Sequence, residues 1–574
     1  MFSVLISWII TTFLFFTFGD ILITIWNMAI KKENSFSVFD TFWLGMCAVG
    51  ISLMITSLVS PICIYINILL VVAAVGYWLF NIKRASRLWQ EIKGKILNLA
   101  WYVKIILVLL AIILIACNLK NLTTYDSGLY YYQTLMWNEQ YSVVPGLGNL
   151  HSRLGFNSNF LLLSTLYYHP AHFITFFPLN TLFVFFVTSW MVIRLFKEKK
   201  VVFQLVLFLA IYLIIKAYFD MLSSLSTDIG PNSIIIYILL SCILNPKSLK
   251  ERVLPLCMLA VFSITFKLSL LLICVIPFII LYILIKEKKY KELSVIVVFM
   301  ALIVIPWCTR FVILTGYLVY PFPALDIFSF DWKMPYKLAE LEKTIIYAFA
   351  NNPFVSIDES LNNTPLDTKW FQAHISWMHT STKFAYALIL FSPILILCFL
   401  KKWKSNWMIL IAWGVSFLGV LMNFFTGPDP RFSQGFVIMA ALTPLLYIPF
   451  GRWNPKIITF GWCVVFAMLF LLYTKLVKEF VIDPKSEYSS LHTFIYKPEP
   501  FLNDVKKEDM VFYEYLIDDV VVYSTNPIGE DPEICYLNCN NRCYDQTLPC
   551  TPYLNVGLEL RGKSLQEGFR IRKE

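Results

Sequence analysis

Apolar runs of roughly helical length alternate with short polar connections along almost the whole chain. A helix that crosses a bilayer needs about 20 mostly apolar residues, with a range of about 17–25. Runs that meet or approach this length lie at 2–30, 38–60, 62–82, 99–117, 173–193, 201–219, 231–245, 253–266, 268–285, 292–314, 384–400, 407–425, 433–450 and 455–478. The pattern predicts an all-α polytopic membrane protein with about 14 transmembrane helices.

The basic residues of the connections indicate how these runs are oriented. If every run crosses the membrane, the basic connections fall on one side, at 31–32, 83–95, 194–200, 247–252, 286–291, 401–404 and 452–456. The other side receives segments with few Lys and Arg for their length, at 118–172, 220–230, 315–383, 426–432 and from about 480 onward. Because cytoplasmic loops hold the excess of Lys and Arg, we expect the second set and both termini outside.

This topology divides the chain into two regions. A transmembrane helical domain is expected over 1–479, with an outer catalytic loop at 118–172 and a second outer loop at 315–383. A small mixed α/β extracytoplasmic domain is expected over 480–574, and it contains four clustered cysteines, Cys535, Cys539, Cys543 and Cys550. Two disulfides are the favoured interpretation in an oxidising compartment. Free thiols and a zinc site are the alternatives, and the pairing is left open.

Composition supports the membrane interpretation. The 574 residues are 58% hydrophobic and 15% charged, whereas soluble proteins are about 25% charged. These values exclude a cytosolic enzyme and an intrinsically disordered chain. The formal net charge is +10, and in a membrane protein such an excess orients helices more often than it binds nucleic acid. We therefore expect the lipid bilayer, and no nucleic acid, as a partner.

The densest polar segment follows the fourth run. Asp126 precedes three tyrosines, beginning with Tyr130, and the candidate ligand contacts His151, Arg153 and Asn157 come after a glycine-rich stretch. Asp126 could cap a helix, and the tyrosines could form an interfacial aromatic belt. A carboxylate at the mouth of a helix bundle can instead act as a general base toward a hydroxyl. The glycines would suit close approach to a ligand.

Three other residues complete the candidate site. Lys267 lies between two short apolar runs, and a lysine at such a depth is a functional candidate; it could instead snorkel to the headgroups. Arg431 could bind a phosphate or form a local ion pair with Asp429. Asp228 could cap the helix that begins at Pro231. It could also join Asp126 in binding a divalent cation, Mg²⁺ or Mn²⁺, or sugar hydroxyls.

Asp126, its position after an early span and the outer loop after a later one resemble the superfamily of polyprenyl-phosphate-sugar-dependent membrane glycosyltransferases (GT-C). Residues 125–157, 428–432 and 549–552 are also similar to an uncharacterised family of bacterial polytopic membrane proteins. The superfamily resemblance implies a GT-C-like fold. Many of its members have two adjacent acidic residues in this loop, but Ser127 follows Asp126 here.

The superfamily resemblance implies transfer of a sugar, of hexosyltransferase type, from a polyprenyl-phosphate donor to a hydroxyl of a glycan, lipid or protein. Asp126 would be the base, and Lys267 and Arg431 would stabilise the leaving phosphate. The expected location is the bacterial inner membrane, with the site facing the periplasm or exterior. That location fits a role in the cell envelope and in surface polysaccharide biosynthesis.

Two other functions fit the same residues. A surface-polysaccharide polymerase or ligase would use a lipid-diphosphate-linked glycan and rely on Arg153, Arg431 and His151. A lipid-linked-glycan transporter or flippase would place ionisable residues such as Lys216 and Lys267 near the membrane midplane. No cofactor is certain from the sequence.

Overall fold

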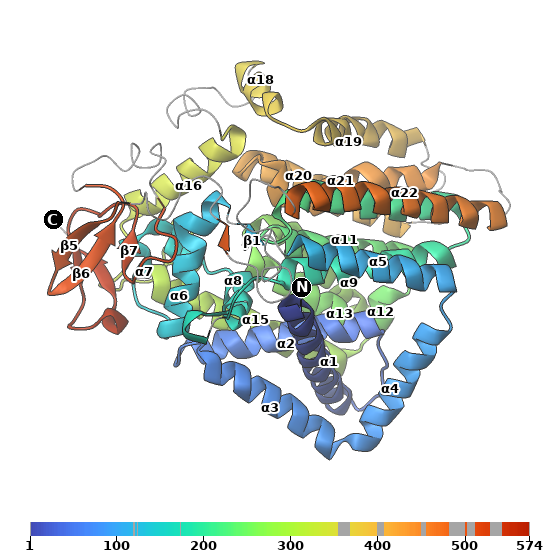
Figure 1. Ribbon diagram of the computed structural model, residues 1–574, viewed down its shortest axis with the longest axis horizontal. Helices are drawn as coiled ribbons and strands as arrows, with labels where there is room; N and C mark the ends of the chain where they lie inside the picture. Colours follow the sequence, from blue (N-terminus) through green and yellow to red (C-terminus); the bar gives the residue numbers. More distant parts are fainter. Residues whose placement is uncertain are drawn as a thin grey trace.

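The computed structural model describes residues 2–118, 121–122, 124–172, 174–353, 368–398, 407–448, 455–481, 500–501, 511–527 and 542–572. Helices dominate this part of the chain (Figure 1). Nine of its helices are long and apolar enough to cross a membrane: α1 (Phe2–Ile30), α2 (Val38–Ser57), α9 (Leu179–Lys197), α10 (Val201–Tyr218), Leu268–Lys286, α15 (Tyr290–Thr315), α19 (Thr380–Cys398), α20 (Trp407–Thr426) and Lys456–Thr474. The protein is a mostly helical, multi-pass membrane protein.

The other predicted runs are also helical but do not meet this length by themselves. α3 (Ile64–Phe80) and α4 (Ile82–Leu97) could together form a tenth span, but they are bent by 95°. α5 (Trp101–Cys117), α11 (Ile229–Leu244) and α13 (Val253–Phe266) are shorter apolar helices. The run at 433–450 contains α21 (Gln434–Leu442) and the 3-10 helix η9 (Thr443–Tyr447), where Pro444 lacks the N–H that a continuing helix would need. The count of 14 crossings therefore stays a prediction.

Basic connections gather at one end of the helices. Arg252 precedes α13, and its Nε donates to Asp40 near the start of α2 at 3.0 Å. Lys250 forms an ion pair with Glu287, which follows α14 (Val275–Lys286). Lys267 follows the other end of α13, about 21 Å away at 1.5 Å per residue. The connection that contains Lys250 and Arg252 and the break at Lys267 therefore lie at opposite ends of α13, as the sequence pattern predicts.

The loop after α5 folds into many short elements at the opposite end. They are η1 (Ser127–Tyr131), α6 (Tyr132–Gln140), α7 (Leu147–Leu150), η2 (Ser152–Gly155), α8 (Asn159–Ser164), η3 (Thr165–Tyr167), β2 (Tyr168–His169), η4 (Pro170–His172) and β3 (Ile174–Thr175). α16 (Tyr336–Asn351) and α18 (Thr368–Ser376) come from the second large loop. Figure 1 shows α16 near the C-terminal strands.

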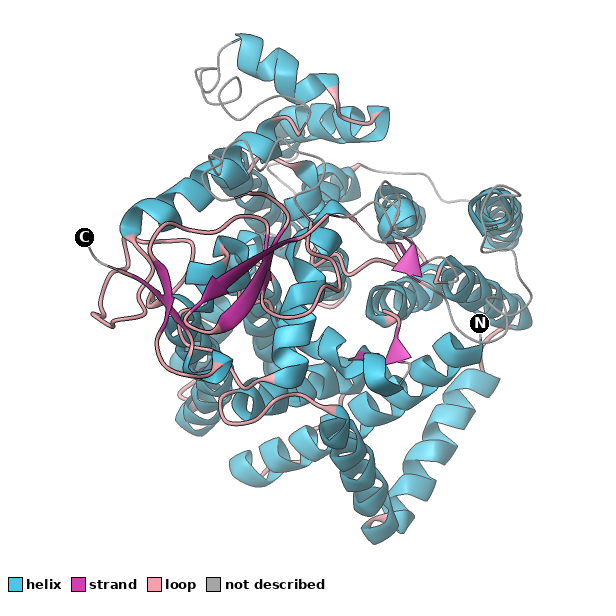
Figure 2. Ribbon diagram, turned by 60° about the vertical axis from the view of Figure 1, so that its left-hand side comes forward, coloured by secondary structure: helices cyan, strands magenta, loops and turns pink. Residues whose placement is uncertain are grey.

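The C-terminal region contains short strands, as predicted (Figure 2). β5 (Tyr513–Ile517), β6 (Val520–Ser524) and β7 (Cys550–Thr551) form a three-stranded sheet in that order, with β5 and β6 antiparallel and β6 and β7 parallel. β8 (Leu558–Leu560) pairs with β9 (Phe569–Ile571), and β4 (Pro500–Phe501) pairs with β1 (Asn121–Leu122). Cys543 and Cys550 form a disulfide, while Cys535 and Cys539 lie outside the described residues.

Candidate active site

Asp126 stands immediately before the π-helix η1, which continues directly into α6. Its side chain makes no capping hydrogen bond to the described backbone. Instead, Oδ1 accepts a hydrogen bond from Nη1 of Arg153 at 3.1 Å, and 23% of the side chain stays exposed. Single π turns frequently mark functional sites. The capping alternative therefore does not describe what this carboxylate does.

The glycines of this loop make room for the protein's own C-terminal segment. The amide of Tyr544 donates to the carbonyl of Gly128 at 2.8 Å, and a Cβ on Gly128 would lie 2.5 Å from the Tyr544 ring. Gly146 has a φ of +65°, and its Cβ would collide with the carbonyl oxygen of Phe569. The expectation of close approach to a ligand is therefore corrected for Gly146, because the backbone of Phe569 occupies that space.

Arg153 joins Asp126 to a carboxylate that the sequence reasoning missed. Its Nε donates to Oε1 of Glu342 at 3.0 Å, and Glu342 is buried. Its guanidinium carbon also lies 5.8 Å from the ring centroid of Tyr130. A signal for Glu342 was present in the sequence, since it follows Ala339 and precedes Ile345 at helical i+3 spacing on the buried face of α16. An acid on an apolar helical face indicates a buried partner.

Asp228 binds two cations that come from distant parts of the chain. It stands at the start of α11 but makes no capping hydrogen bond through its side chain to the described backbone. Oδ1 contacts Nζ of Lys267, and Oδ2 lies 3.4 Å from Nε of Arg431. Nε of Arg431 also lies 3.2 Å from Asp429. The local Arg431–Asp429 pair is thus present, and Asp228 joins it to Lys267.

Both cations of this cluster are held against other side chains of the site. Lys267 lies at the break between α13 and the 3-10 helix η6 (Leu268–Cys274), with Nζ 3.5 Å from the ring centroid of Phe432. The side chains of Lys267 and Arg431 are 23% and 34% exposed. Both side chains therefore contact the buried carboxylate of Asp228 and still have surface exposed to the cavity, where a ligand could bind.

Burial and neighbouring charges decide the ionisation of the polar groups beyond the spans. Burial raises the pKa of Asp429. Burial alone would lower the pKa of Arg431, but the charges of Asp429 and Asp228 outweigh it and raise that pKa, so the guanidinium stays a cation. Burial, with a smaller effect of Arg153, lowers the pKa of His151 to about 3. His151 is therefore neutral at pH 7.

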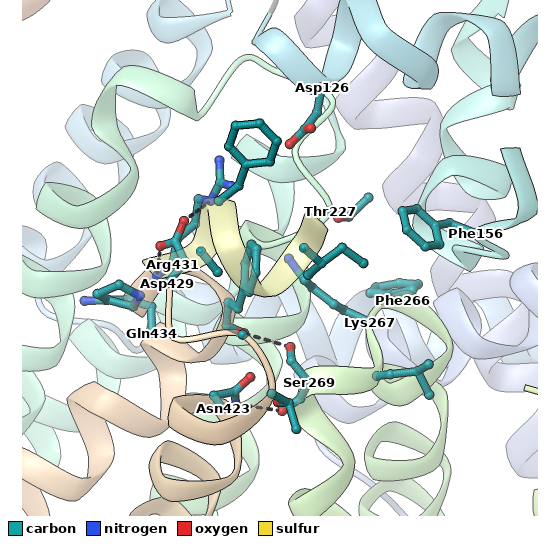
Figure 3. A pocket seen from close by; sticks show the side chains of 18 of the residues that line it. Asp126, Phe156, Thr227, Phe266, Lys267, Ser269, Asn423, Asp429, Arg431 and Gln434 are labelled. Atoms are coloured by element: carbon teal, nitrogen blue, oxygen red, sulfur yellow. Dashed lines mark hydrogen bonds and ion pairs between the residues drawn. The ribbon is translucent and has the colours of Figure 1, made fainter. Parts of the chain in front are cut away.

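A single cavity of about 1200 Å³ adjoins these groups. Six of the eight predicted site residues line it: Asp126, Tyr130, Arg153, Asn157, Lys267 and Arg431. Figure 3 shows Asp126 facing Lys267 and Arg431 across this space. The size exceeds the roughly 300–1,000 Å³ of ordinary small-molecule pockets. The cavity can therefore hold a headgroup together with part of a long chain.

Two predicted residues are not among the described residues that line the cavity. Asp228 lies directly behind Lys267 and Arg431. His151 is buried elsewhere, with its ring 5.9 Å from that of Tyr553. Asn157 does line the cavity, but its amide also donates to the carbonyl of Trp307 at 2.8 Å and accepts from Arg310 at 2.9 Å. A ligand role for these three residues stays a prediction.

One wall of the cavity reaches the outer surface of the helix bundle. Leu271 and Phe425 both line the cavity, and they are 51% and 63% exposed. They lie in apolar helices that are long enough to span a membrane. In a bilayer such side chains face lipid, so an apolar tail could enter the cavity from the membrane.

The carboxylates of the site are paired with cations. Among the described residues, no group of three or more His, Cys, Asp or Glu side chains is placed to hold a metal. Asp126, Asp228 and Asp429 each contact a cationic side chain. The arrangement can accept a proton at Asp126 and bind an anionic group at Lys267 and Arg431.

The sequence model of one protein family, described as "Domain of unknown function (DUF8201)", matches residues 1–438. That stretch includes all the polar residues of the cavity discussed above and ends before the C-terminal strands. No curated protein and no solved structure matches the chain.

Proposed function

Since the chain belongs to the DUF8201 family, whose description assigns no activity, we propose a function from the cavity itself. The protein transfers a sugar from a polyprenyl-phosphate donor to an acceptor hydroxyl of a glycan, lipid or protein. One observation carries this proposal. A single large cavity combines a partly exposed carboxylate, Asp126, with the cations Lys267 and Arg431 and extends to exposed apolar side chains.

The donor phosphate binds at Lys267 and Arg431. As the glycosidic bond breaks, negative charge grows on the phosphate oxygens, and preorganised cations stabilise that charge. Asp228, from behind the cavity wall, and Asp429, within that wall, hold the two cations in place, so the cations need little reorganisation when the charge develops. The polyprenyl chain passes along Leu271 and Phe425 toward the lipid.

Asp126 takes the proton of the acceptor hydroxyl. Arg153 holds Oδ1, whereas Oδ2 has no hydrogen-bond partner among the described residues. The acceptor oxygen attacks the anomeric carbon and loses its proton to Asp126. The bond from that carbon to the phosphate oxygen breaks, and polyprenyl phosphate leaves as the anion. The stereochemistry at the anomeric carbon is inverted.

The charge of the site supports a monophosphate donor. Among the described residues, five carboxylates in or beside the cavity balance five cations, so the formal net charge is zero if all are ionised; they are Asp126, Asp228, Glu340, Glu342 and Asp429, and Arg153, Lys216, Lys267, Lys343 and Arg431. A phosphodiester adds one negative charge, while a diphosphate adds two and leaves a larger uncompensated charge. A polymerase or ligase that uses a lipid-diphosphate-linked glycan is the second candidate, favoured by the two arginines in the cavity.

The proposed location is the outer face of the bacterial inner membrane, in cell-envelope biosynthesis. The cavity lies at the end of α13 away from Arg252 and the basic connections, and such connections tend to stay in the cytoplasm. The Cys543–Cys550 disulfide stands beside the loop that contains Asp126. Disulfides persist in oxidising compartments. Among the described residues, each carboxylate around the cavity has a cationic partner. Binding of a divalent cation stays a prediction.

Replacement of Asp126 by Asn tests the proposal. Purified protein is reconstituted in vesicles with a radiolabelled polyprenyl-phosphate hexose and candidate acceptors, and formation of polyprenyl phosphate is followed. Loss of a general base typically lowers the rate by about 100- to 10,000-fold. D519N serves as the matched control, since Asp519 is exposed in a turn with φ +68°, a conformation that Asn tolerates.

A D126N protein that transfers sugar at the wild-type rate would remove Asp126 from the mechanism. A lipid-diphosphate-linked glycan is tested in parallel. Transfer from that donor alone, lost in R431A but retained in D126N, would favour the polymerase or ligase.

A further inference from the structure

Helix α4 is an element that the proposed function does not use. It follows α3 after the single residue Asn81, and the two helices are bent by 95°. In the described part of the chain, no residue of α4 is buried. Figure 1 shows α4 at the edge of the molecule away from the C-terminal strands. α4 thus turns away from a helix of membrane-spanning character, at the end of the bundle where the basic connections lie.

The two faces of α4 differ sharply in chemistry. At about 100° per residue, the apolar side chains fall within one half of the helix, and they are Ile82, Ala85, Leu88, Trp89, Ile92, Ile96 and Leu97. Ile82, Trp89 and Ile96 are largely exposed. The opposite half contains Lys83, Arg84, Arg87 and Lys95, while Lys93 lies between Ile82 and Leu97 on the apolar half. Glu91 is the single acid of α4, and Lys95 pairs with it at 2.5 Å.

The bend between α3 and α4 is braced against α1. Asp20 of α1 accepts hydrogen bonds from the hydroxyl of Tyr77 at 2.6 Å and from Nη2 of Arg84 at 2.8 Å. The indole of Trp78 donates to Thr17, also in α1, at 2.7 Å. Asp20 is an acid within the first apolar run for which the sequence suggests no role. Its two contacts give it one, since they fix the angle at which α4 leaves α3.

We propose that α4 lies in the plane of the membrane, as a binding surface for anionic phospholipids of the leaflet next to the basic connections. Its apolar face enters the boundary of the acyl chains, and Lys83, Arg87 and Lys93 meet the phosphate groups, while Arg84 and Lys95 are held by Asp20 and Glu91. Three observations select this occupant. They are the near-perpendicular bend between α3 and α4, the exposed apolar row of α4, and the excess of five cations over one acid within α4. An excess of cations complements an anionic membrane surface. The inference does not depend on glycosyl transfer.

Titration of the detergent-solubilised full chain with phosphatidylglycerol tests the proposal. The readout is the concentration that gives half of the maximal thermal stabilisation, with phosphatidylcholine as the neutral reference. The variant K83Q/R87Q/K93Q removes three cations from α4 and keeps the bracing Arg84. The matched control K286Q/K288Q/K291Q removes three exposed cations from another connection at the same end.

Each basic residue near an anionic surface strengthens binding roughly fivefold. We expect the phosphatidylglycerol concentration for half-maximal stabilisation to rise at least about tenfold in the α4 variant. The same concentration should rise much less in the control variant. Equal shifts in the two variants would overturn the proposal, because net charge alone would then explain the binding. The absence of a shift in either variant would also overturn it, because α4 would then contribute nothing to the binding of phosphatidylglycerol.

A second measurement tests the placement without any substitution. A lipid-soluble carbene precursor labels the reconstituted protein, and mass spectrometry locates the modified residues. Labelling of Trp89 and Ile92 without labelling of Lys83 and Arg87 is the expected result. If α4 stays unlabelled while α3 is labelled, protein covers the apolar face, as a second copy or another segment would, and the membrane-surface role is excluded.

Discussion

Replacement of Asp228 by Asn tests whether one buried carboxylate holds together the cationic side of the cavity. The change preserves the size of the side chain and removes its charge. Asp228 is almost completely buried and contacts both Lys267 and Arg431. Among the described residues, Asp228 is the sole carboxylate paired with Lys267. Arg431 retains Asp429 at 3.2 Å. The substitution therefore leaves Lys267 as the cation that loses its partner.

The expected cost follows from the exposure of the two cations. Removing one partner of a fully buried pair costs about 3–5 kcal/mol. Lys267 and Arg431 are partly exposed to the cavity, and Arg431 keeps a second carboxylate, so we expect about 2–3 kcal/mol here. If the loss falls on the unfolding barrier, thermal inactivation becomes roughly 30- to 150-fold faster, at 1.36 kcal/mol per factor of ten.

The assay is the rate at which the protein loses its monodisperse form in detergent at a fixed temperature, for D228N, K267M and the double variant. Replacing both members of a buried pair by neutral groups is often nearly neutral. D228N/K267M is thus expected to be more stable than D228N alone, by about 1–2 kcal/mol. A D228N protein as stable as the wild type, or a double variant no better than D228N, would refute the pairing.

Three further substitutions test other contacts of the site. Gly128→Ala places a Cβ 2.5 Å from the Tyr544 ring, so we expect a loss of about 1–3 kcal/mol and a lower Tm, largely restored by adding Tyr544→Ala. Glu342→Gln leaves Arg153 without one of its two carboxylates. We therefore expect the kcat of sugar transfer to fall by a larger factor than KM changes, and Glu342→Asp to recover part of the lost kcat. The pKa of His151 is about 3 in the folded protein and about 6.5 unfolded, so only the unfolded chain binds its proton between these values. The wild-type Tm should therefore fall more steeply than that of His151→Gln as the pH drops from 6.5 toward 3.

The sequence by itself determined the class of the protein and the ends of its helix bundle. The apolar runs predict helices because a chain in lipid must satisfy its backbone hydrogen bonds internally, and all of those runs contain helices. The charges of the connections also predicted that Arg252 and Lys267 would stand at opposite ends of α13. These properties are local, since each depends on residues that are neighbours along the chain.

Tertiary structure alone decided which partners the polar residues have. Asp228, Lys267 and Arg431 come from three separate segments, and no spacing along the chain predicts that one carboxylate contacts both cations. In the same way, Gly128 meets Tyr544 from more than 400 positions away. Burial makes these choices, because a charge or polar group that leaves water must find a partner among whatever residues the packing brings near. That packing depends on the whole chain, whereas the helices depend on its local pattern.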